Sequence, residues 1–330
     1  MKKCINKRIS SAILALLVLL FAVGVYFVCF HESEGFFLKK YGNADAKFYN
    51  DYIITSVDEG VHMLDFDGNV LKSYNGLKAS WLYTYPEEGL VVYSNHDNET
   101  HLLKLDENMD MVSDEVILTS DILAIDPTIC KVEDTYLVTH TTIDGTINNP
   151  SPDGDNGVYT LKLFVSNDLK EWKQLATIIS EKHDIEDIDM FYENSKLYCV
   201  YEKESYDLGP SEICMRYSKD GGKTWSEEQI LIRNGGDNEP SCIIREHDGW
   251  RLFYSSDKES PGKSYNGASV YSAFYDADFV HISKYDEKID MRGNMGIRLY
   301  EVTEKEEKLY FMFSHNHLTD RNFVLKSINK

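Results

Sequence analysis

The hydrophobic and polar positions of the chain alternate between short apolar runs and polar turns, most clearly between Asp187 and Ile232. The apolar runs are rich in Tyr, Val, Ile and Phe and are bounded by Gly, Asp, Asn or Ser, a composition typical of strands and turns. The predicted strands are Met190–Tyr192, Lys196–Glu202, Ile213–Tyr217 and Glu228–Ile232. The stretch therefore predicts one four-stranded unit.

An Asp-box pattern, S-x-D-x-G-x-x-W, lies between the third and fourth of these strands, at Ser218–Trp225. Its glycines allow left-handed backbone, Asp220 can accept hydrogen bonds from turn amides, and Trp225 can pack between sheets. The pattern indicates an outer turn of a propeller blade and has a structural role. The same positions recur without the glycines at Ser166, Asp168 and Trp172.

The rest of the chain repeats this organisation, because segments of about fifty residues each open with two apolar runs around a polar turn. The units are Phe48–Asn75, Trp81–Leu118, Ile125–Ile179, Asp187–Ile232, Glu239–Ile289 and Met295–Ile328. Such units stacked radially form a β-propeller, whereas a two-sheet sandwich explains neither the repeat nor the Asp-box. We predict an all-β propeller with five or six blades, since the last unit could close the ring with an N-terminal strand.

The N-terminus has a different character. An uncharged run, Ala12–Phe30, follows four basic residues: Lys2, Lys3, Lys7 and Arg8. The run is long enough to cross a bilayer as a helix, and no A-x-A cleavage signal follows it. We therefore predict a transmembrane anchor over 1–30, a linker over 31–47 and the propeller over 48–330, with a cleaved signal peptide as the alternative. The positive-inside rule places the propeller outside the cytoplasm in a single-pass protein.

The acidic charge of the chain narrows the range of partners. There are 34 Lys and Arg against 55 Asp and Glu, a net charge of −21; because residues 1–30 hold four basic and no acidic side chains, the rest carries −25. This charge opposes nucleic-acid binding and favours neutral or cationic partners, Ca²⁺ included. No C-x-x-C pair is present, so we predict no zinc or redox site, no cofactor and no defined metal site.

Carboxylates stand at matching places in three of the units. Asp126 and Glu239 each precede a proline at the head of a unit, and Asp187 and Asp189 stand at the head of the unit between them. The first strand of each propeller blade lines the central channel, so these heads surround one mouth of the channel. Like charges gathered there push pKa values apart. Glycoside hydrolysis uses such a pair, about 6.5–9.5 Å apart in inverting enzymes.

A resemblance to glycoside hydrolase family 43 and its relatives is carried by four motifs within about 120–260: DPTICKVEDTYLV, IDMFYENSKLYCVYE, EPSCIIREHDGWRLFYSSD and the S-x-D-L-x-x-W of 166–172. The resemblance implies a five-bladed propeller that acts on arabinose- and xylose-containing glycans. It further implies Asp126 as the general base, Asp189 as the residue that orients the acid and tunes its pKa, and Glu239 as the general acid.

The chain also departs from that family. The base and the tuning Asp are further apart in the family than Asp126 and Asp189 are here, and a base from the first unit, such as Asp51, fits that spacing better. The Asp-box also resembles the sialidases. However, no arginine occurs between Arg8 and Arg216, so their arginine triad is incomplete. We therefore predict sialidase-like architecture without sialidase activity.

Four further residues are candidates for substrate binding. Trp81 and Trp250 could stack on sugar rings, and Arg216 and Arg298 could bind polar substrate groups. Together, these patterns predict an extracytoplasmic, membrane-anchored propeller that acts on or recognises a carbohydrate, by inverting hydrolysis with paired carboxylates. Because acids before strands are also common turn residues, the alternative is a non-catalytic propeller that binds a surface glycan or a protein partner.

Overall fold

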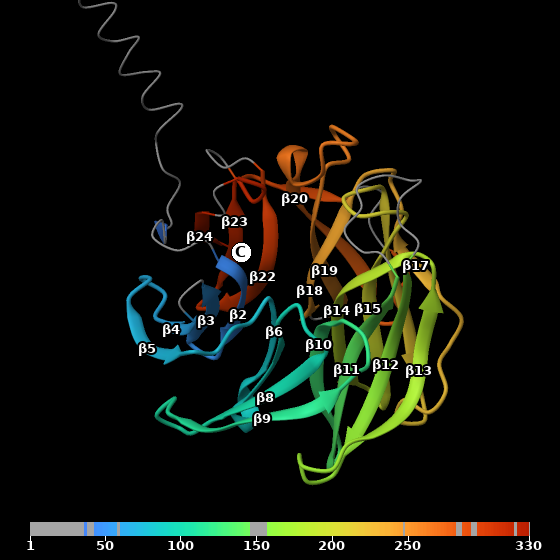
Figure 1. Ribbon diagram of the computed structural model, residues 1–330. Coiled ribbons are helices and arrows are strands. Elements are labelled where there is room, and N and C mark those ends of the chain that lie inside the picture. The colour runs from blue at the N-terminus through green and yellow to red at the C-terminus, as the bar shows by residue number, and fades with distance from the viewer. Residues whose placement is uncertain are drawn as a thin grey trace, which may run out of the picture.

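A computed structural model shows an all-β propeller of six four-stranded sheets (Figure 1). The residues that it describes are 36–37, 43–57, 60–145, 157–246, 248–281, 286–291, 296–319 and 322–329. Within these residues, the only helices are two short 3₁₀ segments, η1 and η2. Of the two blade numbers left open by the sequence, six is correct.

The first three blades follow one another along the chain. Blade 1 contains β2 (Asn43–Tyr49), β3 (Tyr52–Val57), β4 (Gly60–Leu64) and β5 (Val70–Asn75). Blade 2 contains β6 (Trp81–Tyr85), β7 (Leu90–Ser94), β8 (Glu99–Leu105) and β9 (Met111–Thr119), with η1 (Pro86–Glu88) between β6 and β7. Blade 3 contains β10 (Ala124–Val132), β11 (Thr135–Asp144), β12 (Val158–Ser166) and β13 (Lys173–Glu181).

The remaining blades complete the ring. Blade 4 contains β14 (Asp184–Glu193), β15 (Lys196–Glu204), β16 (Ser211–Ser218) and β17 (Gln229–Ile232). Blade 5 contains β18 (Asn238–Glu246), β19 (Gly249–Ser256), β20 (Ser269–Asp276) and β21 (Glu287–Ile289), with η2 (Ser264–Gly267) before β20. Blade 6 contains β22 (Arg298–Lys305), β23 (Lys308–His315), β24 (Asn322–Asn329) and β1 (Phe36–Phe37).

The ring closes by pairing the two ends of the chain. Strand β1 runs antiparallel to β24, with Phe36 opposite Leu325 and Phe37 opposite Val324. Closure by an N-terminal strand, one of the two arrangements considered from the sequence, is therefore confirmed. The segment 31–47, predicted to be a linker, contains β1 and the first part of β2.

The predicted membrane anchor, residues 1–30, lies outside the described residues. In the part of the chain that the structure describes, no helix has the length and apolar character needed to cross a bilayer. The anchor and the extracytoplasmic location remain predictions from the sequence.

Apolar side chains hold the ring together between neighbouring blades. Buried clusters lie at all six blade interfaces, including the closing one, where Ala46 and Ile53 of blade 1 pack with Met312 and Phe323 of blade 6. A blade covered on both faces needs strands that are apolar on both faces, which explains why every residue of β19 is buried. The innermost strands of successive blades contact one another and so surround a central channel.

The turn from Ser218 to Trp225 joins β16 to β17 on the outside of blade 4. The Ser218 hydroxyl accepts the N–H of Gly222 at 2.8 Å, and the Asp220 carboxylate accepts the N–H of Thr224 at 2.9 Å. The indole N–H of Trp225 donates to the carbonyl of Gly222 at 3.0 Å. These bonds hold the shape of the turn, which therefore has a structural role. The turn joins the two outer strands of the blade and lies away from the channel.

Glycine 222 has a measurable role in this turn. Its φ is +93°, and a Cβ placed there would lie 2.4 Å from Leu163 Cδ2, whereas Gly221, with φ +71°, has open space around it. We expect Gly222→Ala to lower the free energy of unfolding by about 2–3 kcal/mol, because backbone strain and overpacking add. Gly221→Ala should cost about 1 kcal/mol, from strain alone. Urea unfolding measures both, and equal losses would show that the contact with Leu163 is unimportant.

Candidate active site

The heads of the innermost strands share a local irregularity. In five of the six blades the innermost strand shifts register near its head, between Asn43 and Asp45, Ile125 and Thr128, Glu186 and Asp189, Pro240 and Cys242, and Leu299 and Glu301. Such β-bulges redirect side chains and are frequent beside active sites. Asp126 and Asp187 lie in two of these bulges with φ of 46° and 48°, values that are unfavourable for residues other than glycine.

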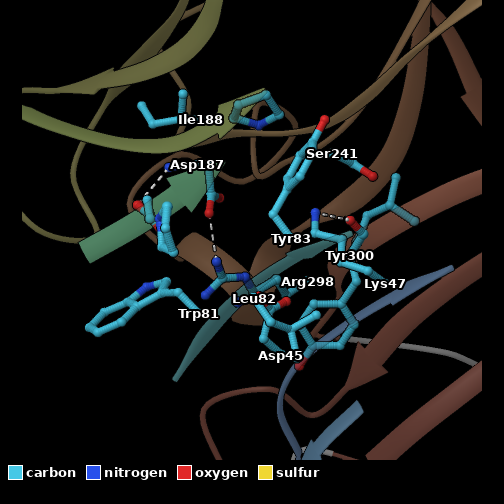
Figure 2. Close-up of a pocket in the computed structure, with 14 residues that line it drawn as sticks. Asp45, Lys47, Trp81, Leu82, Tyr83, Asp187, Ile188, Ser241, Arg298 and Tyr300 are labelled. Carbon is cyan, nitrogen blue, oxygen red and sulfur yellow. Dashed lines mark hydrogen bonds and ion pairs between the residues drawn. The ribbon is translucent and has the colours of Figure 1, made fainter. Parts of the chain in front are cut away.

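The bulged heads surround a cavity at one end of the channel, which we call the channel mouth (Figure 2). Its volume is about 40 Å³, room for only a few water molecules. All six blades contribute to its lining: Asp45, Lys47, Trp81, Leu82, Tyr83, Asp126, Pro127, Asp187, Ile188, Pro240, Ser241, Arg298, Leu299 and Tyr300.

Asp187 lies at the centre of the polar contacts in the mouth. Its Oδ1 is 2.7 Å from Nη2 of Arg298, toward which it points in Figure 2. Its backbone N–H donates to Oδ2 of Asp126 at 3.0 Å, and its carboxylate is hydrogen-bonded to Glu239. Burial opposes the charge on Asp187, but Arg298 and the hydrogen bond from Glu239 outweigh it, so the pKa of Asp187 is lowered.

The two flanking carboxyls behave in the opposite way. Asp126 and Glu239 are only 7% and 5% exposed. Burial, with the nearby charge of Asp187, raises the pKa of Asp126 to about 8. Burial, followed by Asp237 and Asp187, raises the pKa of Glu239 well above its usual range. An ionised Asp187 in the lining of the mouth therefore accepts a hydrogen bond from a protonated Glu239, which is not itself part of the lining but precedes Pro240, which is.

Asp189 is placed differently from its predicted position beside Glu239. The hydroxyl of Tyr83 donates to Asp189 Oδ1 at 2.6 Å, and Asp189 is not part of the lining of the mouth. Burial raises the pKa of Asp189, and the hydrogen bond from Tyr83 and the charge of Lys47 offset only part of this rise. Because the bulge in β14 falls between Glu186 and Asp189, Asp187 is the residue of this strand that contacts Glu239.

Comparisons with known proteins identify the fold. No protein-family model and no curated protein matches the chain. Among solved structures, a β-1,2-mannobiose phosphorylase from Listeria innocua in complex with β-1,2-mannobiose aligns at 11% identity and TM-score 0.51, over 89% of this chain and 90% of that one. The chain therefore shares the propeller fold of this phosphorylase.

Two arabinanases have the same fold. An α-L-arabinanase from Penicillium chrysogenum, complexed with arabinobiose, aligns at 10% identity and TM-score 0.51, over 76% of this chain and 92% of that one. A native Bacillus subtilis arabinanase aligns at 12% identity and TM-score 0.50, over 75% and 93%. At these identities the likeness shows the fold alone, and the sialidase-like architecture predicted from the Asp-box stays a prediction.

One carboxylate of the mouth was missed by the sequence analysis. Asp45 of β2 accepts the N–H of Ala46 at its Oδ1 and the N–H of Leu82 at its Oδ2, both at 2.8 Å. Asp51, the first-unit residue named from the sequence, lies instead in the turn at the other end of β2, where it is exposed and pairs with Lys305 at 2.9 Å. The sequence did contain a signal for this strand, because apolar residues alternate in NADAKFY. Most of that segment was assigned to the linker.

The predicted substrate-binding residues divide into two pairs. Trp81 and Arg298 line the mouth. Trp250 is 4% exposed and stacks on Phe279 at 5.1 Å between blades 4 and 5, so it is a core residue. Arg216 donates to the hydroxyl of Tyr201 and to the carbonyl of Ser226 within blade 4, away from the mouth. Trp81 and Arg298 are therefore the two predicted residues that reach the mouth, and Trp250 and Arg216 do not.

Proposed function

We propose that the protein acts on a carbohydrate at the channel mouth by inverting glycoside hydrolysis, with Glu239 as the general acid and Asp126 as the general base. The proposal depends on the contacts of Asp187 with these two residues. Its backbone N–H donates a hydrogen bond to Asp126, and its carboxylate is hydrogen-bonded to Glu239. Arg298 neutralises Asp187, which can then hold the acid in position. The likeness to carbohydrate-active propellers supports this class of substrate.

The chemistry follows from the two flanking carboxyls. Glu239 holds the proton that the leaving oxygen needs, because burial and then its acidic neighbours disfavour its ionised form. Asp126, when ionised, can take a proton from the attacking water. Asp45 is less suited to the role of base, since each of its oxygens already accepts a backbone N–H and joins blade 1 to blade 2.

A second function is favoured by the size of the mouth. A volume of about 40 Å³ admits water but requires side-chain movement before a sugar ring can enter. A propeller that binds a glycan or a protein at its rim, without cleaving it, fits a mouth of this small size.

A substrate screen separates the two functions. The full-length protein would be incubated with arabino-, xylo- and manno-oligosaccharides and aryl glycosides, with and without inorganic phosphate, and the first product followed by proton NMR. We expect phosphate-independent release of a sugar whose anomeric configuration is inverted, with loss of activity in Asp126→Asn. Retention of configuration or a requirement for phosphate contradicts the proposal. Binding to a glycan without turnover supports the non-catalytic function.

A further inference from the structure

A cluster of buried acids lies between blades 4 and 5, next to the channel mouth. One carboxyl oxygen from each of its four members lies within 4.8 Å of the others. The four residues are between 2% and 5% exposed. We call this group the carboxyl cluster: Glu202 and Glu204 at the end of β15, Asp237 just before β18, and Glu239 in β18.

The cluster lacks the partners that buried carboxyls require. Oε1 of Glu202 and Oε1 of Glu204 are inaccessible to solvent and have no hydrogen-bond partner. The charged groups that act most strongly on both residues are other acids, Asp237 and Glu239 among them. Within the described residues, none of the four forms an ion pair with Lys, Arg or His. Carboxyls in such a site are either protonated or need a cation to compensate their charge, and burial raises the pKa of Glu202 and of Glu204 when no cation is bound.

The spacing and the chemistry of the oxygens indicate which cation the cluster could bind. Ca²⁺ binds oxygen at about 2.3–2.6 Å, so its ligands can be separated by up to about 4.6–5.2 Å. Mg²⁺ binds at about 2.0–2.1 Å, which limits opposite ligands to about 4.2 Å. The oxygens lie within 4.8 Å of one another, a span that Ca²⁺ can bridge, and a buried site built only of carboxylates suits Ca²⁺, since Mg²⁺ usually keeps several of its waters.

We propose that the carboxyl cluster binds one Ca²⁺, with Glu202, Glu204 and Asp237 as ligands. Three carboxylates can supply up to six oxygens, and water can complete the six to eight that Ca²⁺ takes. Glu239 borders the ion and stays bonded to Asp187 in the mouth. Three carboxylates with one Ca²⁺ keep a net charge of about −1, so the occupied cluster still favours the protonated form of Glu239. The sequence predicted no defined metal site, since these ligands come from two blades and follow no short motif.

Calcium binding can be measured directly. The full chain, held in mild detergent and freed of metal with a chelator, would be titrated with CaCl₂ by calorimetry. We expect one Ca²⁺ per chain with a Kd below about 10⁻⁴ M. At a hundredfold excess over Kd, the Tm should rise by about 3–5 °C. The absence of binding by the wild type would overturn the proposal.

Variants locate the ion. Glu202→Gln together with Glu204→Gln should weaken Ca²⁺ binding at least about 100-fold, whereas Glu115→Gln, at an exposed position in blade 2, should leave it unchanged. If the double variant does not fold, as judged by circular dichroism, Asp237→Asn replaces it. Undiminished binding by the variants, or equal affinity for Mg²⁺, would overturn the assignment. No substrate is involved, so the result does not depend on the proposed hydrolysis.

Discussion

Glu239→Gln should lower kcat/KM for a glycoside with a poor leaving group by about 10²–10⁴-fold, the contribution typical of a general acid. The amide keeps the shape of the side chain and its place beside Asp187, but it has no acidic proton for the leaving oxygen. An aryl glycoside with a good leaving group needs little protonation, so its loss should be much smaller. Initial rates on the two substrates, with Glu115→Gln as an exposed control, measure the difference.

The pH profile provides a second test of the same role. Because Asp126 must be ionised and its pKa is raised to about 8, activity should increase with pH up to about 8. Activity should fall at higher pH as Glu239 loses its proton, and Glu239→Gln should remove only this fall. Equal losses on both substrates, or an unchanged alkaline limb, would show that Glu239 is not the acid.

Arg298→Met should lower the free energy of unfolding by about 2–4 kcal/mol at pH 7, because it leaves the partly buried charge of Asp187 unpaired. The Arg298 and Asp187 side chains are 22% and 16% exposed, and their ion pair is 2.7 Å long. The matched control is Arg233→Met, since Arg233 pairs with Glu212 but is 63% exposed. Its loss should remain below about 1 kcal/mol. Urea unfolding of the three proteins measures both effects.

The difference between wild type and Arg298→Met should depend on pH. The pKa of Asp187 is lowered in the folded protein, so its ion pair stabilises the fold above the unfolded pKa, which is about 4. That stability is lost as pH falls through the folded value, so the two proteins should converge in stability below about pH 4. Asp187→Asn combined with Arg298→Met should recover part of the loss. Equal effects of Arg298→Met and Arg233→Met would contradict a buried, functional pair.

The sequence by itself determined the strands, the turns and the repeat of the blades. These features depend on residues close together in the chain, as in the Ser218–Trp225 turn, whose hydrogen bonds all lie within the turn. It also placed Asp126 and Glu239 at the heads of their strands, because each precedes a proline at the start of an apolar run. Local patterns were sufficient for this level of the structure.

The tertiary structure decided the blade number and the partners of each side chain. The chain forms six sheets, and the sixth obtains its fourth strand when β1 pairs with β24, almost 290 residues away in the chain. The carboxyl cluster joins β15 to the start of β18 across a blade interface. Such contacts depend on how distant strands pack, and no short pattern encodes them.

The same limit explains the corrections within the site. Trp250 is a core residue because blade 4 covers it, and Asp45 reaches the mouth because β2 begins earlier than its pattern indicated. Side chains alternate between the two faces of a strand, so one bulge decides which of two nearby acids meets a given neighbour. In β14 that bulge places Asp187 against Glu239 and leaves Asp189 bonded to Tyr83. These contacts were therefore set by the register of the folded sheet, which cannot be predicted from the local sequence.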